Sequence, residues 1–211
     1  MTLIILKMKS NWLDFAQRIE VPAHLAEEVW HKIEQNHSEP HRAYHNLAHL
    51  ETMFRALPQL TGKQELPTAV SLAVWFHDII YDPKSQNNEG DSATLMVNLL
   101  KTHVDKEVLQ EAERLILLTK SHQLDDEKDD NGSILLDADL SILGAELARY
   151  RAYAQAIRYE FSHVPDELYI PGRTAVLNHF LGMAQIYLTE YGREHWEAQA
   201  RQNLTWEIEN L

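Results

Sequence analysis

Two short stretches of the sequence place imidazole and carboxylate side chains where they could do chemistry. In YHNLAH, His45 and His49 stand four residues apart, which on a helix would put both imidazoles on one face. In AVWFHDIIYDP, His77 and Asp78 end an apolar run, and burying them without partners would be costly. Either pair could bind a metal ion. Either could instead be structural, through packing of the histidines or hydrogen bonds of the His-Asp pair to neighbouring helices.

A third stretch, LLDADLSILG, sets Asp137 and Asp139 within another apolar run. Taken alone, either aspartate could cap a helical turn. Together with the two histidine stretches, they complete a mixed set of imidazole and carboxylate ligands, which suits Mn, Fe, Zn, Co, Ni or Mg. The three stretches therefore predict a site for a divalent metal ion. They leave open whether Asp137 shares the role of Asp139.

Two related metal motifs are incomplete in this sequence. YHNLAH has Asn46 where the zinc-protease motif H-E-x-x-H needs its glutamate, so the general base of that class is missing. EKDDNG partly resembles a calcium loop, but it begins with Glu127 instead of aspartate and has Ala138 at the twelfth position. We therefore interpret the run DDEKDDNG, at 125–132, as a solvated acidic loop.

Composition limits the class of protein. A chain of 211 residues that is 45% hydrophobic can bury a substantial core, and one domain is expected. The formal net charge of −13 disfavours binding of a nucleic-acid polymer. With no cysteine there is no disulfide framework and no thiolate site, which fits a cytoplasmic location. The N-terminal TLIIL is too short to span a bilayer, so no membrane partner is expected.

Apolar residues at three- and four-residue spacing predict helices along most of the chain. Pro22, Pro67 and Pro165 stand where helices could begin, and the sequence has no strand-like alternation flanked by hairpin turns. The fold is therefore predicted to be all-α. Helices are expected near 11–20, 22–36, 42–58, 67–81, 91–103, 105–122, 146–163, 173–191 and 193–209.

The order of the candidate ligands resembles that of the HD superfamily of metal-dependent phosphohydrolases. That pattern is a histidine in one helix, an adjacent His-Asp pair in a later helix and a distal aspartate, which are here His49, His77, Asp78 and Asp139. The resemblance implies a compact helical bundle of the HD-domain type, in which these four residues bind a divalent metal ion. It leaves open which metal is bound and whether there are one or two ions.

The resemblance extends beyond the ligands. YHNLAH looks like the Y-H-N-x-x-H segment of cyclic-nucleotide phosphodiesterases, and by that match His45 would donate a proton to the leaving oxygen. The chain is more similar to a bacterial group of predicted HD phosphohydrolases, through WFHDIIYDP, NNEGDSA, LILLTKSH and DADLSILG, over about 40–205. This likeness implies one HD-type domain over 1–211, with a metal-site core at about 40–145 and helices at about 146–211 packed on it.

The activity implied is hydrolysis of a phosphoester by a metal-activated water, most simply of a nucleotide or another small phosphorylated metabolite. Asp78 has a second carboxylate oxygen that could bridge to a second ion. His45, one helical turn from His49, could protonate the leaving group, or could only support the site. Glu89 could orient the water, or could cap the following helix together with Asp91.

Several further residues are candidates for binding the substrate phosphate. His122, in TKSHQ, could face the metal or the phosphate, or lie at the surface. Guanidinium groups match phosphate geometry, but each could equally form structural ion pairs, for example between Arg158 and Glu160. The cationic candidates are Lys120, Arg158, Arg173 and Arg201.

Two other functions stay open at this point. One is a phosphodiesterase that cleaves a cyclic nucleotide or a dinucleotide. The other is a non-catalytic, regulatory HD domain in which the metal supports the fold. The C-terminal aromatic residues Tyr187, Trp196 and Trp206 could pack inside the domain or support a homodimer.

Overall fold

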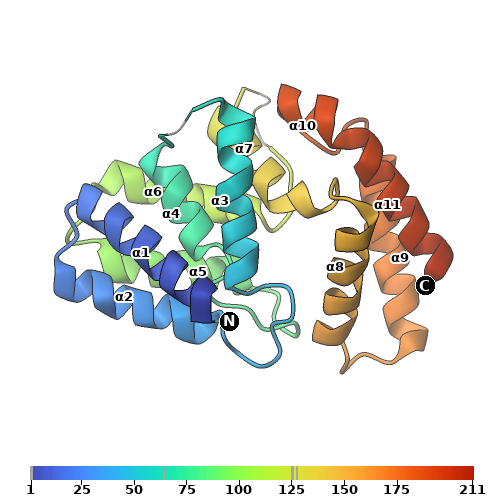
Figure 1. The fold of residues 1–211 in the computed structure, drawn as a ribbon, viewed down its shortest axis with the longest axis horizontal. Coiled ribbons are helices and arrows are strands. Elements are labelled where there is room, and N and C mark those ends of the chain that lie inside the picture. The colour runs from blue at the N-terminus through green and yellow to red at the C-terminus, as the bar shows by residue number, and fades with distance from the viewer. Residues whose placement is uncertain (1, 64, 125, 127) are drawn as a thin grey trace.

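The computed structural model describes residues 2–63, 65–124, 126 and 128–211. These residues form eleven α-helices and one short 3-10 helix and contain no strand, which confirms the all-α prediction (Figure 1). No helix within them is long and apolar enough to cross a membrane. The helices are α1 Thr2–Arg18, α2 Ala23–Asn36, α3 Leu47–Thr61, α4 Thr68–Phe76, α5 Asn88–Leu100, α6 Lys106–Leu118, α7 Asp130–Asp139, η1 Leu140–Ile142, α8 Leu147–Glu160, α9 Asp166–Gly182, α10 Glu190–His195 and α11 Glu197–Asn210.

Helix α4 lies at the centre of the first core, where it contacts α3, α5, α6 and α7. Every residue from Ala69 to Phe76 is buried, because the helix is apolar on all sides and Ser71 is the one polar residue in that span. Trp75 packs against Trp12 from α1, with ring centroids 5.5 Å apart. His77 and Asp78 therefore follow directly on the most buried helix of this core.

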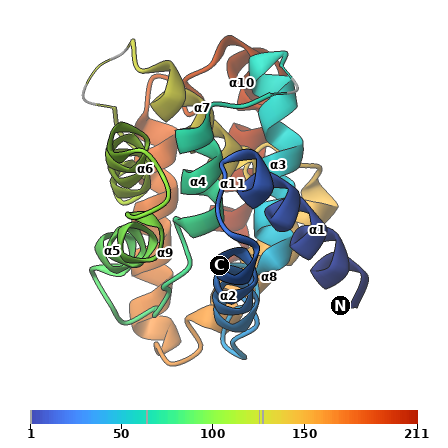
Figure 2. The same ribbon diagram turned by 90° about the vertical axis from the view of Figure 1, so that its left-hand side faces the viewer.

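The C-terminal helices α8, α9 and α11 pack around a second apolar cluster, away from α1 and α2 (Figures 1 and 2). The first cluster extends to Ala138 and the second begins at Ile142, while Trp196 packs against both. Tyr187 is fully buried, and its hydroxyl donates to the carbonyl of Leu140 at 2.9 Å. Tyr187 thus packs inside the molecule. The division into one domain with two parts stays a prediction.

Several helix boundaries differ from those predicted, and capping explains two of them. Helix α3 begins at Leu47 instead of 42, because the side chain of Asn46 accepts a hydrogen bond from the N–H of Ala48. The acidic run at 125–132 was predicted to be a loop, but Asp129 caps α7 by accepting from the N–H of Gly132. The prediction was therefore wrong for 130–132, while Asp125 and Glu127 lie outside the described residues.

Other predicted helices are shorter or displaced. The helix expected at 67–81 ends at Phe76, and the one expected at 173–191 is divided between α9, which ends at Gly182, and α10. The side chain of Thr189 starts α10 by accepting from the N–H of Gly192. Periodicity alone did not locate these turns, because apolar residues continue through them.

Candidate metal centre

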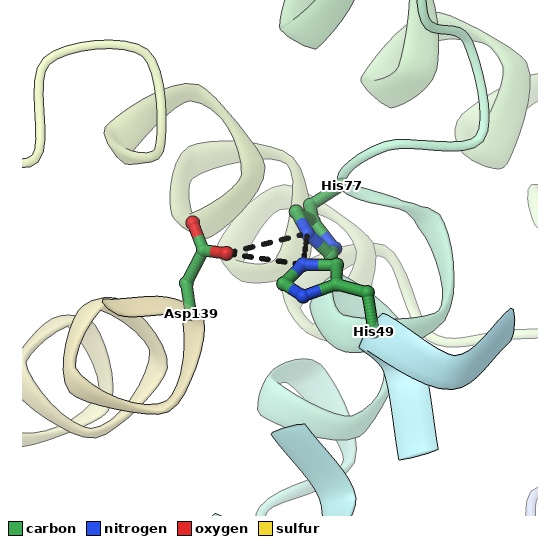
Figure 3. A group of neighbouring side chains, drawn as sticks. All are labelled: His49, His77 and Asp139. Carbon is green, nitrogen blue, oxygen red and sulfur yellow. Dashed lines mark hydrogen bonds and ion pairs between the residues drawn. The ribbon is translucent and has the colours of Figure 1, made fainter. Parts of the chain in front are cut away.

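Three side chains from three separate helical elements converge on one point (Figure 3). His49 comes from the first turn of α3, His77 directly follows α4, and Asp139 ends α7. The Nε2 atom of His49 lies 3.1 Å from Nε2 of His77 and 3.1 Å from Oδ1 of Asp139, and the His77–Asp139 distance is 3.8 Å. Metal–ligand bonds of about 2.1 Å place neighbouring donor atoms about 3.0–3.4 Å apart. This His-His-Asp group could therefore hold a metal ion.

Asp78 borders the same group. Its Oδ2 atom lies 3.1 Å from Nε2 of His77 and 3.8 Å from Nε2 of His49. The structure thus brings together all four residues that the resemblance implies as ligands. Among the described residues, His49, His77 and Asp139 form the group whose donor atoms all lie within 4.8 Å of one another, so a ligand role for Asp78 stays a prediction.

A hydrogen bond to the backbone orients the His77 ring toward His49 and Asp139. Its Nδ1 atom donates to the carbonyl of Val74 at 3.1 Å, which leaves Nε2 as the atom that faces His49 and Asp139. This arrangement presents a lone pair on Nε2 when the ring is neutral, as metal binding requires. Both histidines of the group are buried, with 2% exposure for His49 and 1% for His77.

Arg42 fixes the turn that carries the His-Asp pair, a role that sequence reasoning missed. Its guanidinium donates to the carbonyls of Asp78 at 2.5 Å, Ile79 at 3.1 Å and His45 at 3.2 Å. The side chain is buried and also pairs with Glu39 at 2.9 Å. One cation thereby holds the segment before α3 against the segment after α4. No motif marked Arg42, because it contacts backbone atoms distant in sequence.

His45 does not lie on the same helix face as His49, as the sequence had suggested, because it precedes the first turn of α3. The two rings are nevertheless neighbours, with centroids 5.9 Å apart, and the His45 ring stacks on Tyr81 at 4.2 Å. A bend before the helix thus brings His45 to the group. Its role as proton donor stays a prediction.

Glu160, at the end of α8, holds His45 in place. Its buried carboxylate accepts hydrogen bonds from Nδ1 of His45 at 2.6 Å, from the hydroxyl of Tyr81 at 2.8 Å, and from the N–H groups of Tyr44 at 2.7 Å and His45 at 3.0 Å. Sequence reasoning considered Glu160 only as a partner of Arg158, which instead pairs with Asp166 at 2.7 Å. In the sequence, Glu160 stands between Tyr159 and Phe161, and an acidic residue between two aromatic residues was the available signal.

His122 also reaches the group. Its Nε2 atom lies 3.0 Å from Oδ2 of Asp139, and its ring centroid lies 6.2 Å from that of Phe180 on α9. The backbone of His122 has φ +51°, a left-handed conformation that is uncommon for residues other than glycine, although histidine adopts it more often than most. The contact with Asp139 is therefore made from a left-handed turn that follows α6.

Among the described residues, none of the remaining predicted site residues forms a hydrogen bond or ion pair with the metal group. Glu89 lies in the first turn of α5 and makes no hydrogen bond or ion pair with the described residues. Lys120 donates to the carbonyl of Gln86 at 2.7 Å, and Arg173 pairs with Glu207 at 2.7 Å. Arg201 pairs with Glu197 and donates to the carbonyl oxygens of residues 181, 183 and 184. The structure thus gives these cations, like Arg158, structural contacts.

Asp137 points away from the metal group, although it stands two residues before Asp139. Its carboxylate accepts from the N–H groups of Leu188 and Thr189, both at 2.8 Å, and from the Thr189 hydroxyl at 2.6 Å. Burial raises the pKa of Asp137, and these three donors act in the opposite direction. The open question about Asp137 thus has a structural answer: it anchors the segment between α9 and α10 to α7.

The electrostatics of the group favour a positive charge at its centre. Burial opposes ionisation of His77, but the carboxylates of Asp78 and Asp139 raise its pKa to about 9. Burial also acts against the charged form of Asp139, yet its bonds to His122 and His49 hold its pKa well below the usual range. Burial lowers the pKa of His49. The two carboxylates beside the two imidazoles thus bring negative charge to the group, which a bound cation would neutralise.

A scan against protein-family models and searches of curated proteins and of solved structures find no match to this chain. The resemblance to the HD superfamily therefore stays a prediction. The convergence of His49, His77 and Asp139 indicates that this group could hold a metal ion.

Proposed function

We propose that this protein is a metal-dependent phosphohydrolase of the HD type, acting on a small phosphorylated metabolite. The observation that carries the proposal is the close approach of two imidazole nitrogens and a carboxylate oxygen in a buried position, with Asp78 beside them. His49, His77 and Asp139 would hold a divalent ion, with Asp78 as a fourth ligand. When bound, the ion would supply Lewis-acid polarisation of a water and of a phosphoryl oxygen.

His45 is the proposed proton donor. Hydrolysis uses one water, whose oxygen bonds to phosphorus while the ester P–O bond breaks and the departing oxygen takes up a proton. Burial lowers the pKa of His45, but its hydrogen bond to Glu160 and the nearby charge of Asp78 raise it overall. The bond of Nδ1 to Glu160 and the raised pKa both favour the protonated form of His45, which the proposed proton donor requires.

The test begins with protein that is stripped of metal and reloaded with Mn²⁺, Co²⁺, Ni²⁺, Zn²⁺ or Mg²⁺. Hydrolysis is then measured with phosphomonoesters, nucleotides, cyclic nucleotides and cyclic dinucleotides. His77→Ala is expected to lose both bound metal and activity. His31→Ala, on the exposed face of α2, is the matched control and should lose neither.

The outcomes separate the candidate functions. Hydrolysis of phosphomonoesters supports the proposal, while activity restricted to cyclic substrates would make the protein a phosphodiesterase. Stoichiometric metal binding without hydrolysis of any substrate would point to a non-catalytic domain. Failure of the folded protein to bind any of the five metals would refute the site itself.

A further inference from the structure

Tyr81 ends the segment that carries His77 and Asp78, and its side chain lies against the proposed proton donor. Its ring stacks on that of His45, with centroids 4.2 Å apart and an interplanar angle of 27°. Its hydroxyl donates to Oε2 of Glu160 at 2.8 Å, the same oxygen to which Nδ1 of His45 donates. Tyr81 therefore contacts both His45 and the carboxylate that holds it.

Side chains, and not a helix, fix the backbone that carries Tyr81. Helix α4 has ended at Phe76, yet each carbonyl from residue 78 to residue 81 accepts a hydrogen bond from a side chain. The donors, at 2.5–3.2 Å, are Arg42 for residues 78 and 79, Ser92 for Ile80 and His41 for Tyr81. Because its carbonyls are paired in this way, the turn holds Tyr81 in one position.

The contacts of Tyr81 and Glu160 together restrain the His45 ring. A single hydrogen bond at Nδ1 would leave the ring free to rotate about that bond. Stacking on Tyr81 restrains the plane of the ring, since stacked aromatic rings prefer a defined offset arrangement, and a protonated imidazole is also attracted to the face of a tyrosine ring. With Nδ1 bound and the plane restrained, the direction of Nε2 is set as well.

We infer that Tyr81 is a positioning residue, which sets the orientation of His45 for proton donation. This inference rests on the proposed function and adds a residue to its machinery. Tyr81 stands three residues after Asp78, so a single segment carries two residues beside the candidate metal position and the ring that restrains the proton donor. This segment would thereby keep the two parts of the reaction in a fixed relation.

The first experiment compares two esters that differ in their need for a proton, with Mn²⁺-loaded protein. The leaving group of p-nitrophenyl phosphate departs as a stable anion, whereas that of ethyl phosphate must be protonated. General acid catalysis contributes about 10²–10⁴-fold, so Tyr81→Leu should lower kcat at least roughly tenfold for ethyl phosphate and less than about threefold for p-nitrophenyl phosphate. Tyr159→Leu is the matched control, since Tyr159 precedes Glu160 in α8 but is 57% exposed.

The second experiment observes His45 directly by proton NMR, in protein to which the diamagnetic ion Zn²⁺ has been added. The Nδ1 proton in the 2.6 Å bond to Glu160 should give a far-downfield resonance, assigned by its absence in His45→Asn. This resonance should shift in Tyr81→Phe, which loses the hydroxyl bond to the same oxygen, and should be lost to exchange with water in Tyr81→Leu. Tyr81→Phe keeps the ring, so it tests the inference even if Tyr81→Leu does not fold.

The results distinguish this inference from the proposed function. If the His45 resonance is unchanged in the Tyr81 variants, or kcat falls equally for the two esters, the positioning role is overturned and the phosphohydrolase proposal stands. The same holds if Tyr159→Leu has effects as large as those of Tyr81→Leu. If the wild type hydrolyses neither ester with any of the five metals, the proposed function fails, and the role in proton donation fails with it.

Discussion

Replacing Glu160 with glutamine keeps the size of the side chain but removes the charge that holds His45. The carboxylate accepts four hydrogen bonds, and glutamine has a single acceptor oxygen for them. If that oxygen keeps the two N–H donors, the amide NH₂ faces Nδ1 of His45, where the carboxylate accepted at 2.6 Å. The His45 ring must then lose its Nδ1 proton or turn away.

The expected cost follows from these contacts. A hydrogen bond to a charged group contributes about 1.5–3 kcal/mol, and the two bonds to Oε2 are the ones disrupted. The Glu160 side chain is fully buried, while that of His45 is 20% exposed and can regain some hydration. We therefore expect Glu160→Gln to lower the free energy of unfolding by roughly 3 kcal/mol at neutral pH.

The pH dependence gives a second readout. Burial alone would raise the pKa of Glu160, but its bonds to His45 and to two backbone N–H groups lower it to about 2. A carboxyl group with a lowered pKa stabilises the fold above its unfolded pKa, near 4.5, and this contribution is lost as the pH falls through the folded value. Glu160→Gln should therefore lose most stability above pH 4.5 and approach the wild type at lower pH.

Urea unfolding followed by circular dichroism between pH 3 and pH 7 measures both effects. Glu194→Gln, at an exposed position in α10, removes the same charge and is the control. A loss of less than about 0.5 kcal/mol in Glu160→Gln would be no larger than that of an ordinary surface substitution. Such a result, or an equal loss in the control, would refute the reasoning.

Three further predictions concern other buried groups. Asp137→Asn should lower the free energy of unfolding, measured by urea titration, by about 2–3 kcal/mol and should keep metal binding. Asp139→Asn should weaken metal binding, measured by metal analysis, with a smaller effect on the free energy of unfolding. Burial and the charge of Arg42 lower the pKa of His37 to about 3. Below about pH 6.5 the unfolded chain therefore binds a proton at His37 that the folded protein does not bind. Stability should fall with decreasing pH by up to about 1.4 kcal/mol per pH unit from this group, and His37→Phe should remove that slope in unfolding measured from pH 7 to pH 4. Mn²⁺ at about 100 times its dissociation constant should add about 2.7 kcal/mol of stability, seen as a higher melting temperature that is absent in His77→Ala.

The fold class and the convergence of the metal group are the parts that sequence patterns predicted best. Apolar spacing reveals helices, and a histidine or aspartate in an apolar run stands out because burial of a polar group requires a partner. Burial marked His77, Asp78, Asp137 and Asp139 in this way, whereas His49 and the choice of Asp139 came from the resemblance to the HD superfamily. Burial alone did not distinguish Asp137 from Asp139, because both interrupt the same apolar run.

The residues that position the site were harder to predict. Arg42 acts through carbonyl groups of His45, Asp78 and Ile79, and carbonyl groups carry no sequence signature. Glu160 lies more than a hundred positions from His45 and is one of many acidic residues in the chain. The cationic phosphate-binding candidates were chosen by residue type alone. The ion pairs of Arg173 and Arg201 depend on how α9 and α11 pack, which the sequence does not state.

The metal group and the proposed proton donor depend on different parts of the molecule. His49, His77 and Asp139 belong to α3, α7 and the segment after α4, which pack around the first core. His45 is held by Glu160 from α8, which packs on the second cluster. Because Glu160 makes no hydrogen bond to the side chains of His49, His77 or Asp139 among the described residues, Glu160→Gln should alter proton donation more than the affinity for metal. The relative position of the two clusters would then determine whether a bound phosphoester meets its proton donor.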